Sequence, residues 1–182
     1  VLKTPQIDTI AARGTLFRKF YVASPVCMPN RASLMTGRMP AAHGVRSNGI
    51  PLSQDSVTFV DLLRDAGYDT ALIGKSHLQN FTSAPALSHP APVRAGYRQP
   101  SPGLRQAMRI DLTGATYGQE HPSYWAKPGA HIGTPFYGYG HVEVVTGHGD
   151  AVGGDYRAWL RSKDPAALNL LGPENSAPHD YV

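Results

Sequence analysis

The only cysteine of the chain, Cys27, is followed at short spacing by Pro29 and Arg31. A lone cysteine cannot form an internal disulfide or a multi-cysteine zinc site, so its thiol is inert, reactive or covalently modified. A phosphate-binding cysteine loop that ends in arginine needs five residues between the two. That spacing would place the arginine at position 33, where the chain has Ser33, so this alternative is excluded.

A second group of reactive side chains stands at Gly74-Lys75-Ser76-His77, directly after the apolar run 70–73. Lysine supplies positive charge for an anionic group, and histidine can donate a hydrogen bond or a proton to a departing oxygen. Alone, Lys75 and Arg31 would be read as solvated surface residues. Their importance depends on whether the fold brings them to Cys27.

Start and stop signals predict the elements that must position these residues. Pro29 suits the first turn of a helix that ends at Gly37, which places Cys27 at or just before a helix N-terminus. Lys75 and His77 follow a short buried strand, where ligands collect in α/β sheets. The expected elements are helices at 5–13, 29–36, 59–66 and 154–162 and strands at 15–22, 70–73 and 141–146.

The region from Asn80 to Pro135 differs from the rest, with repeated Pro, Gly and Ser and no sustained period. We interpret it as a long excursion, because connections of this length are uncommon in a compact domain. The chain starts at Val1 without Met and stops at Val182 without a closing element, so we expect an internal fragment.

Two segments carry a family resemblance: PVCMPNRASLMTG at 25–37 and GYDTALIGKSH at 67–77. They resemble the two signatures of the sulfatase family, whose kernels are Cys-x-Pro-x-Arg followed by Thr-Gly, and Gly-Lys-x-His. The resemblance runs more loosely over residues 1–78 and faintly through 141–160. It implies an α/β fold, specifically an incomplete alkaline-phosphatase-like domain with a mixed, mainly parallel sheet flanked by helices. Residues 1–182 would then form a single partial catalytic domain.

The resemblance implies that Cys27 is converted to formylglycine and that the catalytic residues are Cys27, Arg31, Lys75 and His77. A hydrated aldehyde has one hydroxyl to attack sulfur and a second that later expels sulfate, which a thiol cannot do. The helix N-terminus would favour the ionised diol and the sulfate oxygens. Arg31 would reach back to residue 27 and hold it or its partner ligands, and Lys75 and His77 would bind substrate.

The resemblance also implies a divalent cation, expected to be Ca²⁺ with Mg²⁺ or Mn²⁺ as alternatives, bound by residue 27 as formylglycine. The remaining ligands of the family's site would lie outside this chain, so we expect the segment alone to be inactive. His43 is expected to be structural. Gly-rich loops with polar residues are more often turns than metal sites. The polar residues not expected to bind a metal on this ground are His141, His148, Asp150, Asp155, His179 and Asp180.

Charge and partners complete the expectations. The 17 Lys and Arg against 13 Asp and Glu give a net charge of +4, but no basic cluster interleaved with aromatics stands out, so nucleic acid is not expected. The chain contains no apolar run of about 18 residues, so no membrane span is predicted. Expected partners are a small-molecule or carbohydrate sulfate ester and the formylglycine-generating enzyme. A phosphonate monoester or phosphodiester hydrolase, and a non-catalytic domain of the same fold, remain as alternatives.

Overall fold

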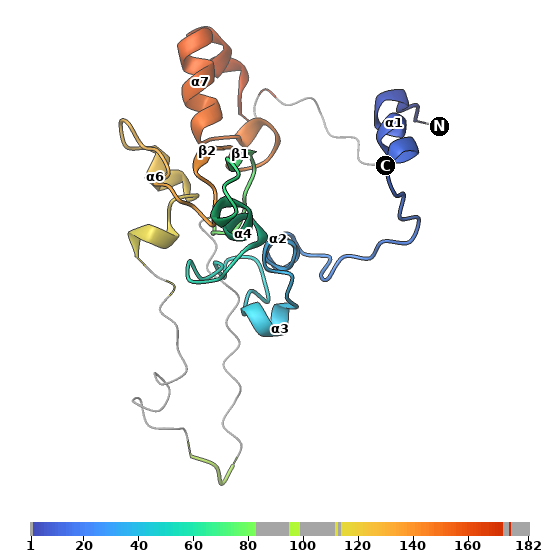
Figure 1. Ribbon diagram of the computed structural model, residues 1–182. Coiled ribbons are helices and arrows are strands. Elements are labelled where there is room, and N and C mark those ends of the chain that lie inside the picture. The colour runs from blue at the N-terminus through green and yellow to red at the C-terminus, as the bar shows by residue number, and fades with distance from the viewer. Residues whose placement is uncertain (1, 83–94, 99–111, 113, 173–174, 176–182) are drawn as a thin grey trace.

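Two parallel strands lie at the centre of the computed structural model, which describes residues 2–82, 95–98, 112, 114–172 and 175. Strand β1 (Ala71–Gly74) pairs with β2 (His141–Val144), in a register that runs from Ala71 opposite His141 to Gly74 opposite Val144 (Figure 1). Both strands were predicted from the sequence. Parallel strands flanked by helices confirm the α/β class.

Four helices of the described chain were predicted, and the structure adjusts their ends. Helix α2 (Cys27–Thr36) begins two residues earlier than expected and ends at Gly37, whose φ of 65° is left-handed. Helix α4 (Phe59–Asp65) begins at a capping box in which Thr58 and Asp61 exchange hydrogen bonds. The remaining two are α1 (Pro5–Arg13) and α7 (Asp155–Lys163).

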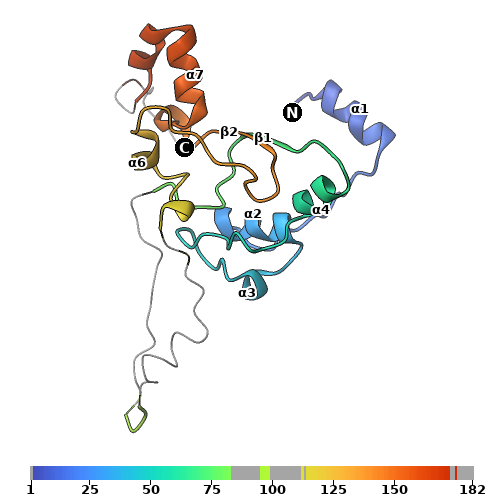
Figure 2. The same cartoon turned by 60° about the vertical axis from the view of Figure 1, so that its left-hand side comes forward.

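Helix α7 is tied directly to the sheet. The Asp155 carboxylate at its first turn accepts a hydrogen bond from the backbone N–H of Val144, at 2.7 Å. Figure 2 shows α7 and α6 on one side of the strand pair, with α2, α3 and α4 on the other. The carboxyl end of β1 leads into the segment between these two groups of helices.

Five short elements were not predicted, because segments of at most six residues are too short to show a period. They are α3 (Pro40–His43), α6 (Pro122–Trp125), and the 3₁₀ turns η1 (Ala115–Tyr117), η2 (Gly149–Ala151) and η3 (Pro165–Leu170).

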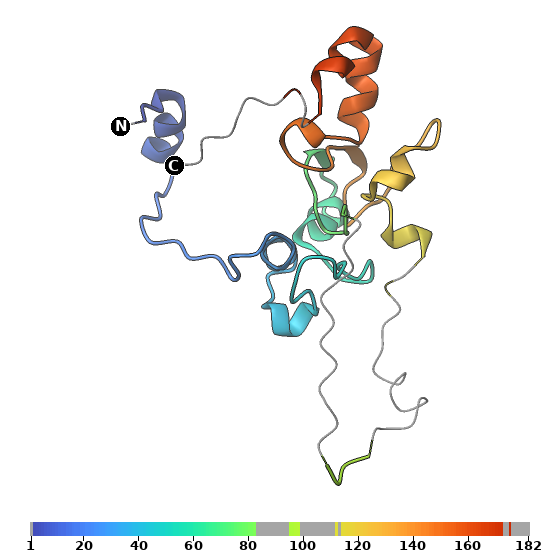
Figure 3. The ribbon, with the colours of Figure 1, turned by 180° about the vertical axis from the view of Figure 1, so that it is seen from behind.

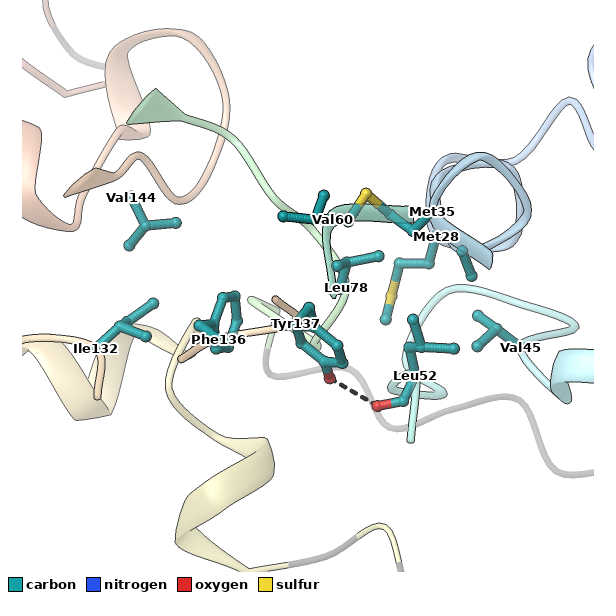
Figure 4. Close-up of a cluster of buried hydrophobic side chains, with 11 residues drawn as sticks. Met28, Met35, Val45, Leu52, Val60, Leu78, Ile132, Phe136, Tyr137 and Val144 are labelled. Carbon is teal, nitrogen blue, oxygen red and sulfur yellow. Dashed lines mark hydrogen bonds between the residues drawn. The ribbon is translucent and has the colours of Figure 1, made fainter. Parts of the chain in front are cut away.

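The core runs from α2 to β2 (Figure 4). Met28 and Leu52 are fully buried, and the Tyr137 hydroxyl donates a hydrogen bond to the Leu52 carbonyl at 2.6 Å. Ile132 is buried in the same cluster. The last part of the 80–135 excursion, from residue 114 onward, therefore packs on the body of this chain.

The predicted strand at 15–22 is wrong. This segment has no regular structure and links α1 to α2, and Figure 3 shows α1 lying apart from the other elements. A strand needs a hydrogen-bonding neighbour, and within the part of the chain that the structure describes only β1 and β2 pair. The large apolar side chains here stay exposed, for example Phe20 at 74% and Tyr21 at 85%.

Apolar side chains on α4 and β1 are also uncovered. Leu62 is 64% exposed and Ile73 is 75% exposed, and Phe59 and Leu63 are partly exposed beside them. The apolar face of Phe59, Leu62 and Leu63 on α4 is thus not covered by the described residues. In the described ranges no helix combines the length and apolarity that a bilayer crossing would demand.

Candidate active site

Cys27 is the first residue of α2 and its side chain is exposed to solvent. Val26 before it has extended backbone angles and provides no side-chain cap, so the first N–H groups of the helix are not capped by that residue. The next residue is held firmly, because the backbone N–H of Met28 donates to the Asn48 side-chain oxygen at 3.0 Å. Cys27 thus combines an accessible side chain with a fixed backbone at a helix N-terminus.

Arg31 joins the two sequence motifs. Its guanidinium lies one turn into α2 and donates hydrogen bonds to the backbone carbonyls of Lys75, at 2.9 Å, and Ser76, at 3.3 Å. We expected Arg31 to hold residue 27 or its partner ligands, and in the structure its side chain binds the segment after β1 that carries Lys75. This contact brings Lys75 and His77 to the same end of the molecule as Cys27.

Lys75 is a half-buried cation among aromatic rings. Its ammonium lies 2.6 Å from Nε2 of His148 and 4.7 Å from the centre of the Phe81 ring. Because an ammonium can only donate, His148 Nε2 is the acceptor. Burial and the neighbouring Arg31 lower the pKa of Lys75. A positive charge held at the end of a strand in this way is suited to binding an anion.

His77 is buried, with 2% of its surface exposed, and its φ of 54° lies in the left-handed region. Its ring stacks on Phe81 at 3.8 Å between centroids. Within the described residues its Nδ1 has no hydrogen-bond partner. Burial, followed by the positive charges of Lys75 and Arg31, lowers the pKa of His77 to about 3. The imidazole is therefore neutral at pH 7.

Glu120 is a site neighbour that the sequence did not reveal. Its carboxylate is completely buried and accepts hydrogen bonds from the backbone N–H groups of His77, at 2.6 Å, and Gln79, at 2.5 Å. Burial raises the pKa of Glu120 to about 7, against the opposing effect of these N–H donors. A single glutamate in an aperiodic segment carries no sequence signal that could have linked it to residue 77.

Comparison with known proteins places this chain in a family. The profile described as Sulfatase matches residues 1–102, more than half of the chain, and contains all four candidate residues. The chain belongs to the sulfatase family.

Named sulfatases among its relatives include human steryl-sulfatase and mouse N-acetylgalactosamine-6-sulfatase. The first is 42% identical over 90 residues, which are 42% of this chain and 15% of the relative. The second is 36% identical over 102 residues, 48% of this chain and 19% of the relative. A solved structure, the putative sulfatase yidJ from Bacteroides fragilis, is 34% identical with a TM-score of 0.42 and covers 47% of this chain and 20% of its own. The sulfatase chain thus spans about a fifth or less of the length of each of these proteins.

Of the six polar residues that were weighed as metal ligands, His148 is described beside a candidate residue of the sulfatase chain, Lys75. His141 instead contacts Glu143 at 3.1 Å, and Asp155 holds the Val144 N–H. Asp150 lies in η2. His179 and Asp180 are outside the described residues.

His43 has a structural role, as expected. Its Nδ1 accepts from the Val45 backbone N–H at 3.1 Å, so Nε2 carries the proton and donates to the Ser33 hydroxyl at 2.9 Å. Burial lowers the pKa of His43, which fits this neutral ring. The histidine therefore fastens the loop after α3 to helix α2.

A metal site is not complete in the described part of the sulfatase chain. Nowhere among those residues do three His, Cys, Asp or Glu side chains gather closely enough to hold a metal ion. Cys27 alone cannot satisfy a hard cation, which needs about six to eight oxygen ligands. The described residues therefore do not by themselves fit the cation that the resemblance implied.

The buried state of His77 predicts its titration. We expect its imidazole C–H resonances to stay constant from pH 8 to about pH 4, because its pKa in the folded protein is about 3. The unfolded chain binds a proton on His77 below about pH 6.5, whereas the folded chain does not. The His77 contribution therefore makes the folded state less stable as the pH falls from about 6.5 towards 3. NMR spectra of wild type and His77→Gln assign the signal, and a midpoint near 6.5 would show that His77 is solvated.

Proposed function

We propose that this chain forms the part of a sulfate ester hydrolase that carries the nucleophile. The observation that carries the proposal is the pair of hydrogen bonds from Arg31 to the carbonyls of Lys75 and Ser76, which unites the Cys27 motif with the Lys75 and His77 motif. Membership of the sulfatase family and the names of its relatives support a sulfuric ester as the substrate class.

The nucleophile in this proposal is formylglycine derived from Cys27, made by a formylglycine-generating enzyme. Once formed and hydrated, this group supplies a hydroxyl that attacks sulfur and a second that releases sulfate when the aldehyde returns. The exposed position of Cys27 gives a maturation enzyme access to the thiol. The helix N-terminus at residue 27 favours negative charge on the substrate and on the nucleophile.

Lys75 and His77 have different roles in this proposal. Lys75 binds the sulfate oxygens through its ammonium, which already has one contact to His148 and keeps other N–H bonds for substrate. His77 donates to the oxygen of the departing alcohol. Burial is the largest cause of its low pKa and the charges of Lys75 and Arg31 follow, so an anionic substrate that offsets these charges would raise the pKa of His77 from this low value.

A divalent cation belongs to the same proposal. We expect Ca²⁺, with Mg²⁺ or Mn²⁺ as alternatives, bound by residue 27 and by ligands beyond the described residues. Such a cation would supply positive charge near the nucleophile and the sulfate group. The proposed substrates are small-molecule or carbohydrate sulfate esters, in keeping with the sulfated sterol and N-acetylgalactosamine in the names of the relatives.

The substrate class is tested with the full-length protein on two matched esters. We expect an aryl sulfate to be hydrolysed with a kcat/KM at least about tenfold above that for a phosphonate monoester with the same aryl leaving group. Matched leaving groups ensure that the rates differ only through the transferred group. A reversed preference would indicate a phosphonate hydrolase, and hydrolysis of neither ester by protein with modified Cys27 would contradict the proposal.

A further inference from the structure

The segment between Lys75 and Gln79 is held from two sides, by the half-buried guanidinium of Arg31 and by the buried carboxyl group of Glu120. Arg31 binds the carbonyls of Lys75 and Ser76, and Glu120 binds the N–H groups of His77 and Gln79. The carbonyls of Lys75 and Ser76 thus face a guanidinium group. The N–H groups of His77 and Gln79 face a carboxyl group. We call residues 75–79 the His77 loop.

The conformation of His77 needs such support. A non-glycine residue with a φ of 54° lies in a sparsely populated, strained region of backbone conformation, which persists where its surroundings hold it. In this conformation the N–H groups of residues 77 and 79 converge on one carboxylate, as in an anion-binding nest. Glu120 supplies both acceptors from a site with no exposed surface.

A second set of contacts fastens the segment that carries Glu120. The Gln79 side-chain amide donates to the Thr116 carbonyl at 2.8 Å, and its oxygen accepts from the Gln119 backbone N–H at 2.9 Å. The Gln54 side chain donates to the same Thr116 carbonyl at 2.9 Å, but it does not belong to the His77 loop. Residues 116–120, which we call the clasp, are therefore bound to Gln79 through backbone groups of Thr116 and Gln119. Glu120 is the residue of the clasp whose side chain reaches the His77 backbone.

We propose that Glu120 is a positioning residue that holds the His77 loop in its left-handed conformation and so directs His77 towards the leaving group. This inference rests on the proposed function for its kinetic consequence, but the structural part stands on the contacts alone. Glu120 does not touch substrate in this scheme. Its effect reaches the reaction through the backbone of His77.

Glu120→Gln is the matching substitution, because it keeps the size and one acceptor but presents N–H groups where the second acceptor was. With histidine and glutamine labelled by ¹⁵N, we expect the amide signals of His77 and Gln79 to move upfield and their hydrogen exchange to accelerate on the order of tenfold or more. Gln54→Ala is the control, because it removes a contact to the same clasp without touching the His77 loop. The two amide signals should stay in place in that variant.

Kinetic measurements on the full-length protein distinguish positioning of His77 by Glu120 from a general contribution of Glu120 to the folded structure. Glu120→Gln should lower kcat for aryl sulfates with basic leaving groups on the order of tenfold, with little change in KM and a smaller loss for good leaving groups. In a double-mutant cycle, adding Glu120→Gln to His77→Ala should cause no further loss. Gln54→Ala should keep wild-type rates.

Different results overturn the inference and the proposed function. Unchanged amide signals in Glu120→Gln, or a kinetic loss that is equal for all leaving groups and additive with His77→Ala, would overturn the positioning role. Absence of sulfate ester hydrolysis in the wild type would overturn the proposed function, while the amide signals would still decide whether Glu120 holds the loop. If Glu120→Gln does not fold, Glu120→Asp takes its place, because the shorter carboxylate keeps the charge but cannot span both N–H groups.

Discussion

Replacing Cys27 by alanine is expected to abolish sulfate ester hydrolysis, with a loss on the order of 10⁴-fold or more in kcat. Cys27 is the only cysteine in this chain, so no other cysteine of the chain can be converted to formylglycine in its place. Lys75 and His77 remain in this variant, and KM for any residual activity should therefore change little. Steady-state kinetics on an aryl sulfate provide the measurement.

Ser24→Ala serves as the matched control for that substitution. The Ser24 hydroxyl accepts a hydrogen bond from the Val26 N–H at 3.3 Å, so this variant alters the same exposed segment without removing the thiol. Wild-type turnover is expected for it. If Cys27→Ala retained activity within about tenfold of wild type, the nucleophile would have to be another group.

Lys75→Ala and His77→Ala should each reduce turnover on the order of 10²-fold or more, but with different dependence on the leaving group. The Lys75 ammonium stabilises charge on the sulfate group, so its loss should be similar for all aryl sulfates. His77 donates to the departing oxygen, and its loss should grow as the leaving group becomes more basic. A series of substituted phenyl sulfates measures both slopes.

Lys127→Ala controls for the change in net charge, because Lys127 is exposed on the turn after α6. It should leave the rates at the wild-type level. An equal loss across the whole series in His77→Ala would refute the role of His77 as a donor to the leaving oxygen. A loss in Lys75→Ala that grew with leaving-group basicity would refute the assignment of Lys75 to the sulfate group.

Local signals in the sequence explain the parts of the fold that could be predicted. Pro5, Gly37 and Thr58 begin or end helices through their own backbone or side-chain preferences, which do not depend on distant residues. The segment 15–22 has the composition of a strand but no strand beside it, so composition alone was misleading. Propensity predicts that a segment can pair, whereas pairing also requires a neighbour.

The candidate site also has residues that could be predicted from the sequence and others that could not. Cys27, Arg31, Lys75 and His77 could be selected because they stand in two short motifs. The partners of Arg31 could not be predicted, because its bonds go to backbone carbonyls that any residue provides. Glu120 joins His77 only through the return of residues 114–120 to the core. Such long-range contacts leave no trace in residue spacing.

The most direct test of this account is the mass of the peptide that contains Cys27, from full-length protein produced together with a formylglycine-generating enzyme. The exposed thiol at the start of α2, in the Cys27-x-Pro29-x-Arg31 spacing, predicts that the peptide carries an aldehyde or its hydrate in place of the thiol. The Cys27→Ala peptide, with no thiol to convert, fixes the reference mass. A fully unmodified thiol, in a preparation where a control substrate of the same enzyme is converted, would contradict the central claim that residue 27 becomes the nucleophile.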